Sequence, residues 1–210
     1  AERCCYGGFV FSGQTCISLQ RLFVHEDVYN DFVPKFVNRV KEIKIGNPMD
    51  ESTMMGPMIQ LKEAERAESW IKEAVAGGAK ILTGGKRNGT ILEPTVLADT
   101  KANMKVNCNE VFGPIVTVAK FASFYDAVDQ VNDSVFGLQA GIFTKNIGKI
   151  FSAYNKLDIA GLIVNDVPTF RVDNMPYGGV KESGVGREGV IYAMEEMMEP
   201  KLLVFRNLFR

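Results

Sequence analysis

The first segment of this chain that could carry out chemistry is a glycine followed three residues later by a cysteine. It reads Gly13-Gln14-Thr15-Cys16, and we expect a short helical turn to start there. A cysteine in the first turn of a helix lies at the positive end of the helix dipole, which favours thiolate over thiol. Gly13 would let the backbone approach a ligand closely, and backbone N–H groups around Cys16 would stabilise an oxyanion. The segment indicates a nucleophile, although alone such a pattern more often marks a buried structural cysteine.

Two more clusters combine polar and aromatic residues with glycines. One is Glu110-Val111-Phe112-Gly113-Pro114, in which a carboxylate precedes an aromatic ring on a loop that leads into a strand. The other spans residues 175–184 and continues through Gly186-Arg187-Glu188. No strand-to-helix turn precedes it, so it does not match a dinucleotide-binding fingerprint. Taken singly, the first is interpreted as an exposed acid beside a core phenylalanine, and the second as a structural loop.

The thiols and the single imidazole argue against other classes of site. The four cysteines are Cys4, Cys5, Cys16 and Cys108, and the only histidine is His25. Without a Cys-x-x-Cys motif or further histidines, a zinc site lacks ligands. A cysteine hydrolase would need His25 as its base, but the strand expected between Cys16 and His25 would point the imidazole elsewhere. We therefore expect no metal, and a cytoplasmic protein with reduced thiols.

The composition is that of a globular protein. The 210 residues include 24 Lys and Arg against 25 Asp and Glu, a net charge of −1, and 46% are hydrophobic. The two signs are interspersed, which gives no electrostatic case for binding nucleic acid or an anionic membrane. No apolar run approaches the roughly 18 residues of a transmembrane helix. The chain does not begin with Met, and we expect it to be processed or excised from a longer one.

Strand and helix patterns alternate along the chain. We predict strands over residues 21–25, 80–83, 91–97, 115–121, 139–144 and 161–165, and helices over 27–43, 60–76, 124–133 and 147–157. A strand or loop is expected at 9–11, and a strand at 202–205. Several strands lack polar alternation, which is typical of a parallel sheet covered on both faces. The prediction is a single α/β domain.

Taken together, these segments resemble the catalytic domain of the NAD(P)-dependent aldehyde dehydrogenase superfamily from end to end. The resemblance rests on Gly13-Gln14-Thr15-Cys16 with Arg21, Gly46-Asn47-Pro48, Gly56-Pro57, Gly84-Gly85, Glu93-Pro94-Thr95, Glu110-Val111-Phe112-Gly113-Pro114, Gly137-Leu138, Asn165, Pro176-Tyr177-Gly178-Gly179 and Ser183-Gly184. Each segment is common, but the full set in this order is very specific. It implies that residues 1–210 form a three-layer, doubly wound α/β domain, with a mostly parallel sheet and helices on both faces.

The resemblance also implies a role for each matching residue. Cys16 corresponds to the nucleophile that attacks an aldehyde, gives up a hydride to NAD or NADP and holds the product as a thioester. Glu110 corresponds to the acid that binds the nicotinamide ribose, and Phe112 to the aromatic beside the nicotinamide ring. Tyr177 lies where the family has an aromatic in the aldehyde pocket, and Arg171 lies near another position that lines it.

Arg171 has two interpretations. Family pockets often have an apolar residue near this position, so a guanidinium here could hold an anionic or hydroxylated group at the far end of the aldehyde. The alternative is that Arg171 pairs with a nearby acid, either Asp166 or Asp173.

Some functional parts of the family have no match in this sequence. In the family, the Glu that serves as deacylation base, an oxyanion-stabilising Asn and the cofactor-binding domain precede the cysteine, and only 15 residues precede Cys16 here. We therefore expect the catalytic half of a larger enzyme, which would be inactive alone.

The resemblance also implies partners for this catalytic half. They would be a small aldehyde, an upstream NAD- or NADP-binding domain and further copies of itself, joined through a tail strand at 198–210. Arg66 is a weak match to a family position near the far cofactor ribose. The alternatives are a coenzyme A-acylating aldehyde dehydrogenase and a non-catalytic assembly domain of the same fold.

Overall fold

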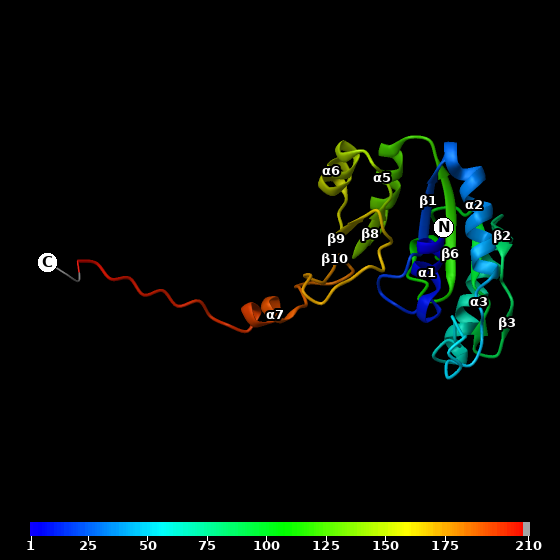
Figure 1. The fold of residues 1–210 in the computed structure, drawn as a ribbon, viewed down its shortest axis with the longest axis horizontal. Helices are drawn as coiled ribbons and strands as arrows, with labels where there is room; N and C mark the ends of the chain where they lie inside the picture. The colour runs from blue at the N-terminus through cyan, green and yellow to red at the C-terminus, as the bar shows by residue number, and fades with distance from the viewer. Residues whose placement is uncertain (208–210) are drawn as a thin grey trace.

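The computed structural model describes residues 1–207 and contains a four-stranded central sheet (Figure 1). The strand order is β1-β6-β5-β2. The bounds are β1 Arg21–His25, β6 Ile115–Phe121, β5 Thr95–Ala98 and β2 Lys80–Thr83. β1 and β5 both run parallel to β6, and β2 is an antiparallel edge strand beside β5. The prediction of a mostly parallel sheet is confirmed.

Two apolar clusters cover the two faces of this sheet, because successive side chains of a strand point to opposite faces. Val116 of β6 packs with Phe36 on one face, whereas Ile115 packs with Ala67 on the other. The first face carries α1 (Glu2–Phe9) and α2 (Glu26–Lys41), and the second carries α3 (Leu61–Ala76) and α4 (Lys105–Cys108). The predicted three-layer arrangement is therefore confirmed.

The remaining elements lie beside this core, except α7, which lies on the segment that leads away from it toward the C-terminus (Figure 1). They are η1 Val10–Gly13, β3 Arg87–Asn88, β4 Ile91–Leu92, α5 Phe124–Asn132, β7 Phe136–Gly137, β8 Gln139–Ile142, α6 Ile147–Lys156, β9 Gly161–Val164, β10 Val180–Lys181 and α7 Val190–Glu196. β8 and β9 pair in parallel, whereas β3 pairs with β4 and β7 with β10 in antiparallel fashion. Within residues 1–207, none of the helices combines the length and apolar character that a membrane crossing needs.

Arg21, at the start of β1, joins the central sheet to α5. Its guanidinium donates hydrogen bonds to the carbonyl oxygens of Gln130 at 3.1 Å and Val131 at 2.9 Å, near the carboxyl end of that helix. A cation is favourable there because the last carbonyls of a helix carry partial negative charge. Burial lowers the pKa of Arg21. The structure thus gives this residue, which is part of the resemblance, a helix-capping position.

Two local predictions near the cysteine were wrong. Residues 9–11, expected to be a strand or loop, are helical instead, because Phe9 ends α1 and a 3₁₀ turn, η1, follows it. Within that turn Phe11 and Ser12 have φ angles of 53° and 58°. Left-handed backbone interrupts a helix, so no helix continues to Cys16, which lies in an irregular turn. The expected position of Cys16 in the first turn of a helix, at the positive end of its dipole, is therefore wrong.

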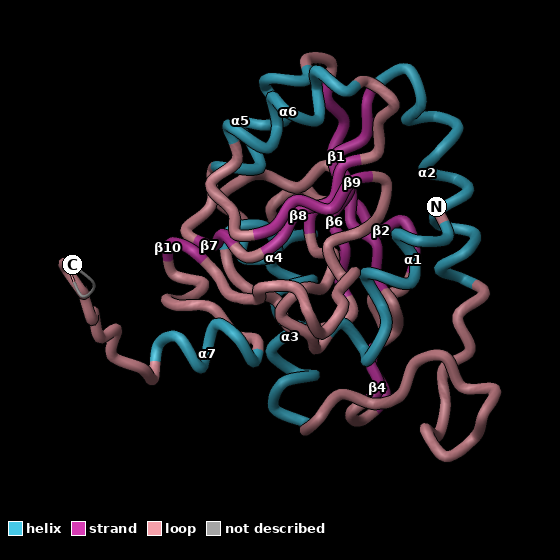
Figure 2. Tube along the Cα trace, turned by 60° about the vertical axis from the view of Figure 1, so that its left-hand side comes forward, coloured by secondary structure: helices cyan, strands magenta, loops and turns pink. Residues whose placement is uncertain are grey.

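The segment after α7 is extended and leaves the body of the molecule (Figure 2). The strand predicted at 202–205 is not formed, and these four side chains are 68–87% exposed. A strand needs a neighbour to accept its backbone hydrogen bonds, and no strand among residues 1–207 pairs with this segment. Residues 208–210 of the predicted tail strand lie outside the described residues, and its role in oligomerisation stays a prediction.

Candidate active site

Two loops meet at the amino ends of β1 and β6. Residues 14–20 lead into β1 and residues 109–114 lead into β6. The two strands are parallel neighbours, with Arg21 opposite Thr117. Because the amino ends of parallel strands lie at one edge of a sheet, the loops come together although they are far apart in the sequence. The first loop carries Cys16, and the second carries Glu110 and Phe112.

A small cavity of about 30 Å³ lies between these loops. Its lining residues are Gly13, Thr15, Cys16, Ser18, Gln20, Glu110, Phe112, Gly113 and Ile115. Cys16 and Glu110 are exposed and Phe112 is 39% exposed, so all three can be reached from solvent. The structure therefore brings three of the five residues named from the sequence to one surface cavity.

Gly13 allows the two loops to touch. Its φ of 68° lies in the left-handed region, where side chains are disfavoured. A Cβ at this position would also overlap the carbonyl oxygen of Gly113 in the opposite loop. Any larger residue would therefore have to separate the cysteine turn from the Glu110 loop.

Gln14 and Ser12 attach the cysteine loop to a third segment. The Gln14 Oε1 atom accepts a hydrogen bond of 2.9 Å from the backbone N–H of Ile59. The Ser12 hydroxyl donates a 2.7 Å hydrogen bond to the carbonyl oxygen of Gly56. These contacts give the glutamine of the Gly-Gln-x-Cys pattern a supporting role that its sequence position did not reveal.

Gln20 is a residue that the sequence analysis missed. Its Nε2 atom donates to the carbonyl oxygens of Val106 at 3.0 Å and Asn109 at 2.7 Å. Its Oε1 atom accepts from the backbone N–H of Val111 at 3.0 Å. Arg66 donates to the Val111 carbonyl at 2.7 Å, which places it against this loop. Both side chains thus hold the loop that carries the two candidate cofactor-binding residues. An isolated glutamine before a strand gives no signal from which this role could be predicted.

We expect Gln20→Leu to destabilise the chain. Leucine has a similar size but satisfies none of the three backbone groups, and each lost hydrogen bond contributes about 1 kcal/mol, so the expected loss is about 2–3 kcal/mol. Urea unfolding would measure it, with Gln130→Leu on exposed α5 as the matched control. An equal loss of unfolding free energy in the two variants would contradict the role of Gln20 in holding this loop.

Exposure separates Cys16 from two of the other cysteines. Cys4 and Cys5 are 3% and 7% exposed, and burial raises the pKa of both thiols, that of Cys5 to about 11. Cys108 is exposed and donates a 3.6 Å hydrogen bond to the carbonyl oxygen of Asn103. Two thiols are therefore accessible in the described part of the chain, and of these only Cys16 lines the cavity.

Tyr177 and Arg171 come from the region after β9, and Tyr177 is the one of the two that approaches Cys16. The Tyr177 backbone is held by two hydrogen bonds with Glu188, of 3.1 and 2.5 Å. Burial raises the pKa of Tyr177, and the neighbouring Cys16 thiol raises it further. The guanidinium carbon of Arg171 lies 4.4 Å from the centre of the Tyr177 ring. Tyr177 thus lies beside the candidate nucleophile, and Arg171 lies against Tyr177.

Comparison with known protein sequences gives a consistent set of matches. A model described as the aldehyde dehydrogenase family matches residues 1–203. The 3-sulfolactaldehyde dehydrogenase of Priestia megaterium is 51% identical over 193 residues, which cover 92% of this chain and 40% of that protein. The lactaldehyde dehydrogenase of Methanococcus aeolicus is 42% identical over 203 residues, covering 97% of this chain and 43% of that protein. The chain thus spans about 40% of the length of these curated relatives.

Solved structures match as well. Aldehyde dehydrogenase 21 from Physcomitrella patens, in complex with the reaction product succinate, has a TM-score of 0.96 and 48% identity over 99% of this chain and 43% of its own. The glyceraldehyde-3-phosphate dehydrogenase GapN of Methanocaldococcus jannaschii, complexed with NADP, has a TM-score of 0.90 and 39% identity, covering 93% of this chain and 42% of its own.

Proposed function

Because the chain belongs to the aldehyde dehydrogenase family, we propose that Cys16 is the nucleophile in the NAD(P)-dependent oxidation of an aldehyde to a carboxylic acid. The observation that supports this most directly is the shared cavity, where the exposed thiol, the Glu110 carboxylate and the Phe112 ring meet. Since the chain spans about 40% of its curated relatives, the proposal covers what these residues contribute to the reaction.

Cys16 acts through covalent chemistry in this proposal. Its thiolate adds to the carbonyl carbon of the aldehyde, and the backbone N–H of Cys16 helps to hold the resulting oxyanion. When NAD(P) is bound, it supplies the acceptor for the hydride that this carbon loses. The carbon then remains on Cys16 as a thioester. Water as acceptor releases the carboxylic acid and the free thiol, whereas coenzyme A as acceptor would release an acyl-coenzyme A.

Glu110 and Phe112 have properties that fit a nicotinamide cofactor. Glu110 is exposed and forms no ion pair within residues 1–207, so its oxygens can accept hydrogen bonds from ribose hydroxyls. Phe112 has a φ of 45° and a 39% exposed side chain beside the cavity. An exposed ring there can pack on a nicotinamide ring. We propose these two residues as the cofactor contacts of this chain.

The names of the relatives suggest the class of aldehyde. The two curated relatives act, by name, on 3-sulfolactaldehyde and lactaldehyde. We propose a short, oxygenated aldehyde as the substrate here.

Reversible addition of an aldehyde to Cys16 tests the proposal. Iodoacetamide should alkylate Cys16, and propanal should slow that reaction, because a thiohemiacetal has no free thiolate. Mass spectrometry of the peptides would follow Cys16 and Cys108 separately, and only Cys16 should be protected. A Cys16 thiol that does not react, or is protected no better than Cys108, would argue instead for a non-catalytic assembly domain.

These 210 residues alone should form no NAD(P)H from an aldehyde. The resemblance places the deacylation base and the cofactor-binding domain in a part of the family's sequence that precedes the cysteine. Absorbance of the reduced nicotinamide would be followed at high protein concentration, with the relative from Priestia megaterium as the positive control. Steady turnover by the 210-residue chain would show that the expectation is wrong.

A further inference from the structure

The cavity gives the thiolate of Cys16 an unfavourable neighbour. Glu110 lines the same cavity, and a carboxylate near a thiol disfavours a second negative charge. Cys16 itself lies in an irregular turn at which no helix begins. A hydrogen-bond donor on the sulfur would favour the thiolate, because hydrogen bonding to the charged form of a group stabilises that form. Tyr177 carries such a donor.

The phenol of Tyr177 is in contact with the Cys16 thiol. Burial raises the pKa of this phenol, and Cys16 raises it further, both through its charge and through a side-chain hydrogen bond. A phenol with a raised pKa keeps its proton at neutral pH. Since a thiolate has no proton to give, Tyr177 can only be the donor in this hydrogen bond.

The backbone around Tyr177 is fixed by its own loop. Tyr177 and Glu188 form an antiparallel bridge with backbone hydrogen bonds of 3.1 and 2.5 Å. The Arg187 side chain donates to the carbonyl oxygens of Gly179 at 3.0 Å and Gly186 at 2.7 Å. These contacts join the two halves of the loop, so the phenol is held by more than its own side-chain contacts.

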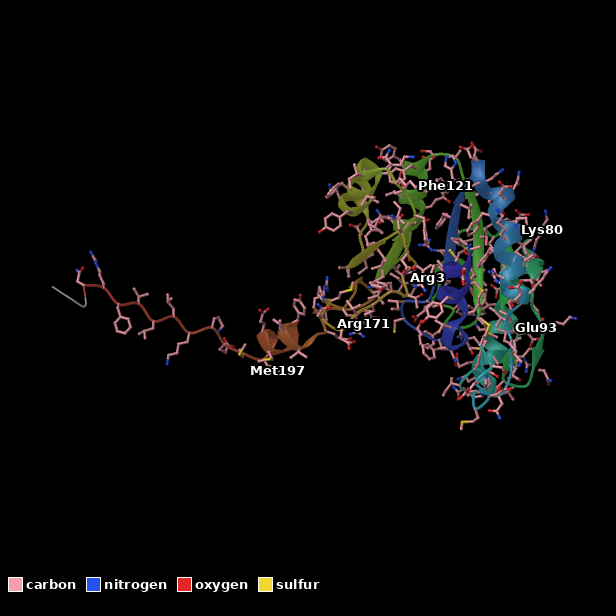
Figure 3. All side chains as sticks on the ribbon, in the orientation of Figure 1. Arg3, Lys80, Glu93, Phe121, Arg171 and Met197 are labelled. Atoms are coloured by element: carbon pink, nitrogen blue, oxygen red, sulfur yellow. The ribbon has the colours of Figure 1, made fainter. Side chains whose placement is uncertain are left out.

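The segment after β9 is also attached to the cysteine turn. The Thr169 hydroxyl lies 3.0 Å from the carbonyl oxygens of both Gly7 and Ile17, to which it donates. Ile17 directly follows Cys16 in the chain. Figure 3 shows Arg171 farther along this segment, where it runs from the body toward α7. Both sides of the contact between phenol and thiol are therefore anchored.

Arg171 lies on the face of the Tyr177 ring. Its guanidinium carbon is 4.4 Å from the ring centre. Its positive charge acts to lower the pKa of the phenol, against the larger effects of burial and of Cys16. An O–H group made more acidic by a nearby cation is a stronger hydrogen-bond donor. Arg171 thus strengthens the donor, while burial keeps it protonated.

No carboxylate neutralises Arg171 within residues 1–207, where its side chain forms no ion pair. Asp166 accepts two hydrogen bonds from Arg3, of 2.7 and 2.9 Å. Asp173 forms no ion pair in the same part of the chain. Pairing of Arg171 with either acid, the alternative drawn from the sequence, is therefore wrong. Its charge is available to act on Tyr177.

We propose that Tyr177 is a catalytic residue, whose phenol O–H donates a hydrogen bond to the Cys16 sulfur and stabilises the thiolate that attacks the aldehyde. When the sulfur bonds to the carbonyl carbon, the negative charge passes from the sulfur to the carbonyl oxygen, and the phenol keeps its proton throughout. The hydrogen bond increases the share of the thiol that is ionised at a given pH, but it makes each thiolate a weaker nucleophile. The inference rests on the proposed function, because it takes Cys16 as the reacting group.

Tyr177→Phe tests this, because it removes the hydroxyl and keeps the ring on which Arg171 lies. The rate of alkylation of Cys16 by iodoacetamide, an uncharged reagent, would be followed from about pH 6 to about pH 10. The midpoint of this profile should rise by about one pH unit, as expected for the loss of one hydrogen bond to a charged group. Below both midpoints the rate should fall about threefold, because the thiolate becomes about tenfold scarcer but about threefold more reactive. Above both midpoints the rate should rise about threefold.

Two controls accompany this substitution. Tyr154→Phe removes a hydroxyl from an exposed tyrosine of α6 and should leave the profile of Cys16 unchanged. Cys108 is the other exposed thiol, and its peptide, followed in the same samples, should keep its profile in Tyr177→Phe. Urea unfolding of both tyrosine variants would show whether the chain is still folded.

The outcomes separate this inference from the proposed function. If the profile of Cys16 is the same in Tyr177→Phe as in the parent chain, the inference is overturned and the proposed function stands. A change of rate in one direction at every pH, or one that Cys108 shares, would mean altered access to the thiol and would also overturn the inference. If propanal does not protect Cys16 in the parent chain, the proposed function fails, and the inference fails with it. Opposite changes at the two ends of the profile, confined to Cys16, support the inference.

Discussion

Replacing Cys16 with serine should remove the fast alkylation of this chain at the cavity and lower aldehyde oxidation about 10³-fold or more. A serine hydroxyl is almost fully protonated at neutral pH, whereas a thiol with an ordinary pKa of about 8.5 is partly thiolate. Activity would be measured in a chimera in which these residues replace the matching part of the Priestia megaterium relative, to which they are 51% identical. Alkylation would be measured on the 210-residue chain, so the two readouts are independent.

Cys108→Ser is the matched control for this substitution. Cys108 is the other exposed thiol, but it does not line the cavity. Its replacement should leave both the reaction of Cys16 with iodoacetamide and the activity of the chimera unchanged. If the chimera stays active with Cys16→Ser, or loses activity with Cys108→Ser, Cys16 is not the nucleophile and the proposal is refuted.

Gly13→Ala should destabilise the chain by about 3 kcal/mol and move Cys16 away from the Glu110 loop. An alanine at a φ of 68° costs about 1 kcal/mol or more. Overlap of its Cβ with the rigid Gly113 carbonyl adds about 1–3 kcal/mol. Urea unfolding would measure the loss of stability, and the alkylation rate of Cys16 would report whether the cysteine turn has moved.

Gly89→Ala separates the two causes. Gly89 has a similar φ of 59°, but an added Cβ there meets nothing within 4 Å. This variant should therefore lose only the backbone contribution, about 1 kcal/mol. Equal destabilisation in the two variants would mean that the contact between Gly13 and Gly113 does not hold the loops together.

Local sequence patterns were sufficient to predict the helices and strands at the centre of the fold. The strand predicted at 115–121 has the bounds of β6, and that at 21–25 has those of β1. The helix predicted at 60–76 begins one residue later, at Leu61. These elements are buried on a sheet face or along one helix stripe, so their apolar spacing directly reflects the core they enter. The strand predicted over 91–97 was less accurate, since it is divided into β4 and β5.

Local sequence patterns predicted the wrong structure where the conformation depends on contacts with distant parts of the chain. Residues around Cys16 carry a glycine and a polar turn that are compatible with a helix start, yet Phe11 and Ser12 take left-handed backbone. The tail at 202–205 has the composition of a strand but pairs with no strand of residues 1–207. A strand is defined by its partner, and no property of its own residues can supply one.

By itself, the sequence determined the family resemblance, the parallel α/β architecture and the choice of Cys16, Glu110 and Phe112 as residues to compare. Only the tertiary structure decided that these three meet, because parallel pairing of β1 and β6 brings their amino ends to one edge. Only the tertiary structure could reveal that Gln20 holds the Glu110 loop, because the hydrogen-bond partners of Gln20 lie far from it in the sequence. It also decided that Arg171 forms no ion pair within residues 1–207. Which acid pairs with which arginine depends on distances in the folded chain, and there Asp166 is held by Arg3.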